Sequence, residues 1–232
     1  VLAQRPSDLR SLSDRFFAAN LLGKLAERRH DYAAAADYAT RAAQAGEDSV
    51  RFNPSDLSAW GFWTTGLRQV ADLQYERGDV TRAIATLHTL LGLEQDKRRP
   101  SSLGPVAWFH WIFLGELQTE LGDPAAGQQS LKSFVRDTGE LVAQLTADDP
   151  RRQILAMPDQ SVGSNLQLIE GVAQSAYTNA MAVVERVEPI KVPGGTANAN
   201  VVKNNVLRGN LSTASAAAIR LGRYAQAETL AR

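Results

Sequence analysis

The sequence predicts an all-α protein built from repeated helical hairpins, and three observations carry this prediction. First, one pattern occurs four times: a turn residue is followed five positions later by a small residue that faces the preceding helix. The turn residues are His30, Gly78, Gly122 and Gly222, and the small residues are Ala35, Ala83, Gly127 and Ala227. Second, no segment alternates apolar and polar residues as a half-buried strand would. Third, alanine, the best helix former, fills runs such as 34–36 and 216–218.

Local signals then place each helix. The segment 53–56 predicts a helix start, with Ser55 as its cap, and Gly78 predicts the stop of that helix. Prolines at first-turn positions open two later helices. Apolar residues at three- and four-residue steps predict one long helix over 164–187. In chain order, the expected helices cover about 7–29, 32–45, 56–77, 80–95, 105–121, 124–146, 164–187, 198–221 and 224 onward.

The turn positions are regularly spaced. The first two intervals are 48 and 44 residues, and Gly122 and Gly222 are 100 residues apart, which is two steps of 50. A further unit should therefore lie between them, although its turn cannot be recognised. We expect one array over 1–232, with units at 7–47, 54–97, 104–147, 150–197 and 198–232, the fourth degenerate and the fifth truncated. Because both ends of the sequence fall inside helical patterns, we expect a fragment of a longer protein.

Composition limits the classes of function. The chain has 25 basic and 25 acidic residues and no net charge, which argues against general binding to nucleic acid or anionic membranes. It has no cysteine, so disulfides and thiolate metal sites are excluded. No apolar run approaches the roughly 18 residues of a membrane span. No signal peptide is visible, and the cytoplasm is slightly favoured.

No catalytic arrangement emerges. The three histidines, His30, His88 and His110, fall in different repeats without metal-ligand spacing, and we interpret them as surface or core residues. His30 takes a position that glycine fills elsewhere, which predicts a left-handed backbone conformation. Asp148-Asp149 is interpreted as a helix-end or linker pair and not as an acid/base pair, and 193–196 lacks a phosphate-loop pattern. We therefore predict no enzyme activity, no metal and no cofactor.

The repeated pattern resembles the tetratricopeptide repeat family. One unit matches the family's signature at Trp111, Leu114, Gly115, Gly122 and Leu131, and another matches it at Leu22, Gly23, Tyr32, Ala35 and Ala42. The resemblance implies an alpha-alpha superhelix, a solenoid of antiparallel hairpins whose concave groove binds a protein or peptide. The spacing of 44–50 residues exceeds the family's usual repeat of about 34. The match is weak over 148–199.

The resemblance also implies which side chains face the groove. They come from the first helix of three units: Phe17, Asn20, Lys24, Arg68, Gln69, Asp72, Phe109, Phe113 and Glu116. Phe109 and Phe113 are the expected apolar anchor, which Trp60, Phe62 and Trp63 could extend. The alternative is that these aromatic side chains pack in the core. One branch of the family binds the carboxylate of chaperone tails with basic residues where this chain has Phe109 and Phe113, so we exclude that ligand.

Two functions remain open at this stage. The first is a non-catalytic scaffold that binds a protein or peptide partner of unknown identity in its groove. The second is a regulatory or sensor module of a multidomain bacterial signalling protein, such as a transcription regulator or kinase, acting through a ligand or an intramolecular contact. Uncapped repeat ends would also allow homo-oligomers to form.

Overall fold

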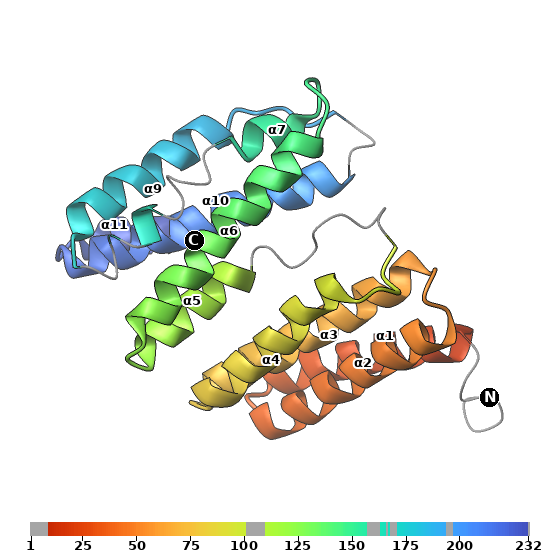
Figure 1. The fold of residues 1–232 in the computed structure, drawn as a ribbon. Coiled ribbons are helices and arrows are strands. Elements are labelled where there is room, and N and C mark those ends of the chain that lie inside the picture. Colours follow the sequence, from red (N-terminus) through yellow and green to blue (C-terminus); the bar gives the residue numbers. More distant parts are fainter. Residues whose placement is uncertain are drawn as a thin grey trace. The chain divides into compact units, whose positions relative to one another are not determined.

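The computed structural model describes residues 9–100, 110–156, 163–165, 167, 171–193 and 197–231. All regular elements within these residues are helical, which confirms the all-α prediction (Figure 1). The chain divides into two compact units, 1–127 and 128–232, which are described separately. None of the helices in the described residues combines the length and apolar character needed to cross a lipid bilayer.

Unit 1 consists of antiparallel helices that pack in chain order. Its elements are α1 (Leu9–Arg28), α2 (Tyr32–Phe52), α3 (Leu57–Glu76), α4 (Val80–Gly92), the short 3₁₀ helix η1 (Leu93–Gln95), α5 (His110–Glu120) and the start of α6 (Pro124–Gln144). Helix α2 packs against α1 and α3, and α4 packs against α3 and α5. Figure 1 shows α1 to α4 side by side, coloured red to yellow.

The predicted turn residues end the helices before them. His30, Gly78 and Gly122 have positive φ angles of 57°, 77° and 87°, which confirms the left-handed conformation predicted for His30. The aspartate that follows each turn residue caps the next helix. Its carboxylate accepts a hydrogen bond from the backbone nitrogen of Ala34 at 3.0 Å, of Arg82 at 3.3 Å and of Ala126 at 3.0 Å, respectively.

Two predicted boundaries in unit 1 were wrong. The cap of α3 is Asp56, whose carboxylate accepts from the Ser58 backbone nitrogen at 2.9 Å, and not Ser55. Helix α2 continues to Phe52, well beyond the predicted end near 45. It continues because Ser49 and Val50 are fully buried and extend its packed side. The Ser49 hydroxyl also donates to the Ala45 carbonyl at 2.7 Å.

Helices α2 and α3 approach closely through two buried glycines. A Cβ atom at Gly46 would lie 2.5 Å from the Trp63 Cα atom, and one at Gly66 would lie 2.5 Å from the Ala43 nitrogen. Only glycine can occupy either position without a backbone shift. At these two points, the backbones of the two helices approach each other directly.

Unit 2 contains the remainder of α6, α7 (Pro150–Ile154), α9 (Ala173–Val187), α10 (Ala197–Arg220) and α11 (Tyr224–Ala231). Helix α10 packs against α7, α9 and α11. The Asp149 carboxylate accepts from the Arg151 backbone nitrogen at 2.8 Å, so the segment 148–150 starts α7. Helix α9 ends at Val187, just before Pro189, as the sequence predicted.

The predicted continuous helix over 164–187 is wrong, because a turn interrupts it at Gly171. This glycine has a φ angle of 81°, and Val172 is not helical. Gly171 lies 49 residues after Gly122 and 51 before Gly222, where the regular spacing required a turn. Ala176, five residues later, is completely buried.

All five turns share one backbone hydrogen bond. The nitrogen of the residue after the turn residue bonds the carbonyl oxygen five positions earlier in the chain. The pairs are Asp31 with Ala26 at 2.9 Å, Asp79 with Gln74 at 2.8 Å, Asp123 with Gln118 at 2.9 Å, Val172 with Gln167 at 2.8 Å and Arg223 with Ala218 at 2.9 Å. The segment with the weakest sequence pattern thus has the same turn as the others.

Candidate functional site

The first helices of the hairpins in unit 1, α1, α3 and α5, contact one another through their side chains. Between α1 and α3, the Gln69 amide nitrogen donates to the Asn20 side-chain oxygen at 2.8 Å. The Phe62 ring of α3 stacks on Phe16 at 4.4 Å between centroids and meets Phe17 edge-on at 5.3 Å. These contacts bring one predicted pair, Asn20 and Gln69, together.

Arg68 connects α3 to α5. Its Nε atom donates to both carboxylate oxygens of Asp72, at 2.7 and 2.9 Å. Its Nη1 atom lies 3.0 Å from His110 Nδ1, and its guanidinium carbon lies 4.8 Å from the Phe113 ring centroid. A guanidinium can only donate, so His110 accepts through Nδ1 and carries its proton on Nε2.

Burial, together with the positive charge of Arg68, holds His110 neutral. Burial lowers the pKa of His110 to about 3, and the positive charge of Arg68 lowers it as well. Burial raises the pKa of Asp72, although the Arg68 guanidinium opposes this rise. The Arg68–Asp72 pair is partly exposed, so it contributes about 1 kcal/mol or less to stability and serves mainly to orient the guanidinium.

Two further side chains, Tyr75 of α3 and Glu116 of α5, lie near Arg68 and Phe113. The Tyr75 ring meets the Phe113 ring edge-on at 5.7 Å. Burial raises the pKa of Tyr75, and the carboxylates of Glu120 and Glu116 raise it further. Surrounding protein atoms raise the pKa of Glu116 to about 7, against the effect of Arg68. Glu116 nevertheless remains exposed to solvent.

We call this surface the first-helix face. It is defined by Phe17, Asn20, Leu21, Arg68, Gln69, Asp72, Tyr75, Phe113 and Glu116. Seven of the nine residues predicted from the sequence belong to it. Lys24 is exposed and makes no hydrogen bond or ion pair with any described residue. Phe109 lies outside the described residues, so its predicted pairing with Phe113 stays a prediction.

The three aromatic residues expected to extend the apolar anchor, Trp60, Phe62 and Trp63, lie in two different environments. Trp60 is completely buried, and its indole nitrogen donates to the Pro54 carbonyl at 2.8 Å. Trp63 packs with it against the buried cluster that contains Val50. These two side chains belong to the core, which was the alternative interpretation. Phe62, in contrast, reaches the first-helix face through its contact with Phe17.

Sequence reasoning missed two residues of this region, Tyr75 and His110. Tyr75 lies three positions after Asp72, and His110 lies three positions before Phe113. Residues three apart are neighbours on one side of a helix, so this spacing could have included them. Among the described residues, no three His, Asp or Glu side chains are grouped as metal ligands would be.

Comparison with known proteins adds little to these observations. No protein-family model matches the chain, and no curated protein sequence matches it. Among solved structures, the chain is similar to BtubC (BKLC) from P. vanneervenii, with a TM-score of 0.40 and 13% sequence identity. That alignment covers 94% of this chain and 87% of the other. A similarity at this level supports no argument about fold or function.

Proposed function

We propose that the chain is a non-catalytic protein-interaction module of the tetratricopeptide-like type, which binds a protein or peptide partner on its first-helix face. Five turns that share one backbone hydrogen bond, spaced by 44 to 51 residues, support the repeat part of this proposal. Stacked hairpins of this kind present one helix of each pair to a common surface.

One observation carries the functional part. The side chains of α1, α3 and α5 are joined directly, by the Asn20–Gln69 hydrogen bond and by the contact between Arg68 and His110. The three helices therefore form a continuous surface. Large apolar side chains remain exposed on it, namely Phe17, Leu21 and Tyr75.

The chemistry of this surface suits a protein partner. Protein interfaces combine aromatic anchors and arginine at their centre with a polar rim. Here Arg68 lies over the Phe113 ring, while Glu116 and Glu120 stand near the exposed Tyr75. A partner segment with apolar side chains could bury the aromatic edges, and the carboxylates would favour a basic residue beside them.

The proposal is tested by selecting peptides from a phage-displayed random library against the chain and measuring the affinity of the selected peptides. Phe17→Ser should weaken binding about tenfold or more, because an apolar anchor is lost. Phe52→Ser is a matched control, since both phenylalanines are 56% exposed and Phe52 lies at the end of α2, a helix that contributes no residue to the first-helix face.

The two variants distinguish peptide binding at the first-helix face from non-specific binding to any exposed apolar side chain. Circular dichroism should show the same helix content for both, because each ring is largely exposed. An equal loss of affinity in the two variants would contradict the proposed location of the site. Failure to select any peptide that the chain binds would contradict the proposed function itself.

A further inference from the structure

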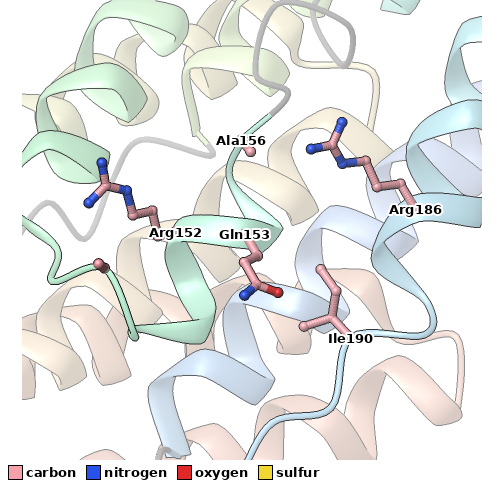
Figure 2. Close-up of a pocket in the computed structure, with 6 residues that line it drawn as sticks. Arg152, Gln153, Ala156, Arg186 and Ile190 are labelled. Carbon is pink, nitrogen blue, oxygen red and sulfur yellow. The ribbon is translucent and has the colours of Figure 1, made fainter.

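Unit 2 contains a cavity of about 440 Å³ between α7 and the end of α9 (Figure 2). Its lining includes Arg152 of α7 and Arg186 of α9. In Figure 2 the guanidinium groups of these two arginines lie on opposite sides of Gln153 and do not converge. They therefore do not form a single charged site for one ligand. The more informative feature outside the proposed interaction surface is the exposed side of α1 in unit 1.

Helix α1 has an exposed apolar side. Leu21, Leu22 and Leu25 are 61%, 43% and 38% exposed, and Ala18 beside them is exposed as well. Because successive residues of a helix are about 100° apart, these side chains fall on one side of α1. Apolar side chains of a helix normally face a core, so this exposed group indicates an interaction surface. With the charged residues at its two ends, it forms the α1 outer stripe, defined by Asp14, Ala18, Leu21, Leu22, Leu25 and Arg29.

The other hairpins of unit 1 indicate what kind of element would cover this stripe. Leu25, Leu73 and Leu117 each lie five residues before the turn residue of their hairpin. Leu73 is buried in a cluster with residues of α2, and Leu117 is buried in a cluster with residues of α4. The covering helix is in both cases the second helix of the preceding hairpin, which runs antiparallel to the helix that it covers. The equivalent position of α1 therefore suits an antiparallel helix.

The charges of the stripe indicate which helix fits. Asp14 lies seven residues before Leu21, and Arg29 lies seven residues after Leu22. In an antiparallel pair of α1 helices with a two-fold axis between Leu21 and Leu22, each Asp14 lies beside Arg29 of the other copy. A parallel pair would instead place Asp14 beside Asp14. Both charged residues are exposed, so the stripe is complementary in charge to an antiparallel copy of itself.

We propose that the α1 outer stripe binds the same stripe of a second copy of this chain, as an antiparallel and two-fold symmetric helix pair. The leucines supply the apolar contact. The two-fold axis also places Ala18 opposite Leu25, so that a small side chain meets a large one. This interaction goes beyond the proposed function and shares only Leu21 with the first-helix face, so each of the two proposals can fail without the other.

Sedimentation equilibrium of the full 232-residue chain, without any peptide, tests the proposal. One helix pair is a small interface, so we expect a monomer–dimer equilibrium with a Kd on the order of 10–100 µM. Leu22→Glu should weaken association about tenfold or more, because it places two carboxylates in the apolar contact. Leu57→Glu is the matched control, since Leu57 is 45% exposed and lies at the start of α3.

Charge reversal tests the direction of the pair and leaves the leucines intact. Asp14→Arg and Arg29→Asp should each weaken association about fivefold, because like charges then face each other. The double variant should associate within about twofold of the unsubstituted chain, since both pairs are restored with reversed signs. Arg77→Asp is the control for net charge and should have no effect: Arg77 is exposed and precedes Gly78 as Arg29 precedes His30.

Three results would overturn the proposal. One is a chain that stays monomeric up to about 1 mM, well above the expected Kd. Another is an equal loss of association in Leu22→Glu and Leu57→Glu. The third is a double charge-reversal variant that associates as weakly as each single variant, which would exclude the antiparallel pair. Circular dichroism verifies the helix content of every variant, and the charge variants alter only exposed side chains.

Discussion

The turn at Gly78 in unit 1 and the turn at Gly171 in unit 2 have the same backbone. Their φ angles are 77° and 81°, and the hydrogen bond that closes each turn is 2.8 Å long. Five residues later, Ala83 and Ala176 are both completely buried. A glycine of positive φ and a small buried residue are thus common to both hairpins.

The two turns differ in how the second helix is capped. The Asp79 carboxylate accepts from the Arg82 backbone nitrogen, whereas Val172 has no side-chain hydrogen bond at the equivalent position. The comparison teaches that the backbone turn forms without a polar cap. The cap contributes stability but is not required for the turn to form.

The largest expected effect comes from enlarging the small buried residue. Ala83→Leu and Ala176→Leu should each lower the free energy of unfolding by about 1–3 kcal/mol, because neither site has room for the added carbons. Urea unfolding followed by circular dichroism measures this, with Ala85→Leu at an exposed position of α4 as the control. If Ala176→Leu were harmless while Ala83→Leu was not, the two hairpins would not be equivalent.

A smaller effect is expected from the turn glycines. Gly78→Ala and Gly171→Ala should each cost about 1–2 kcal/mol, since a side chain strains the left-handed backbone. Gly61→Ala within α3 is the control: nothing lies within 4 Å of the added carbon, so stability should rise by about 0.5–1 kcal/mol. Equal stability of the Gly171→Ala variant and the unsubstituted chain would show that this turn is not formed.

Removing the cap at Asp79 and introducing one at Val172 tests whether the two turns differ only in capping. Asp79→Ala should lower the free energy of unfolding by about 1 kcal/mol, because a backbone nitrogen of α4 loses its partner. Val172→Asp should raise it by a similar amount, since Val172 is exposed and an aspartate there can bond the first turn of α9. Thermal unfolding measures both changes, and a destabilised Val172→Asp variant would contradict the equivalence of the two positions.

The smallest effect on the free energy of unfolding is expected at the turn of Gly222, where Arg223 takes the position that a capping aspartate has in unit 1. Its Nη2 atom donates to the Gln174 side-chain oxygen at 2.8 Å, which connects α9 to the start of α11. This contact is exposed, so Gln174→Ala should cost about 0.5 kcal/mol or less. A loss as large as that of Asp79→Ala would show instead that the contact substitutes for a cap.

Most of this fold could be predicted from the sequence, because residue type and spacing alone identify most of the turn residues. Gly78, Gly122 and Gly222 were recognised from spacing, and His30 from its place in the pattern. Gly171 escaped because Val172 replaces the polar cap and apolar residues continue at helical spacing on both sides. The pattern therefore favoured one uninterrupted helix, and only the regular spacing indicated that a turn was missing.

The candidate site was less predictable, because its contacts join residues far apart in the chain. Phasing on the repeat placed both Asn20 and Gln69 on the groove side of their helices, and they are hydrogen-bonded. The contact between Arg68 and His110 spans 42 residues and depends on how α5 packs, which no local signal reports. Likewise, Trp60 is buried by packing with Val50 and Leu93, which belong to other helices.

The glycine contacts between α2 and α3 limit how chain length can change in unit 1. Ala43 faces Gly66 and Gly46 faces Trp63, so the two contacts are three residues apart on each helix. One residue inserted between Ala43 and Gly46 would rotate the second contact by about 100° relative to the first, and the helices could no longer meet at both points. Insertions and deletions in this part of the protein should therefore be tolerated only in the connecting segment 53–56, outside the two helices.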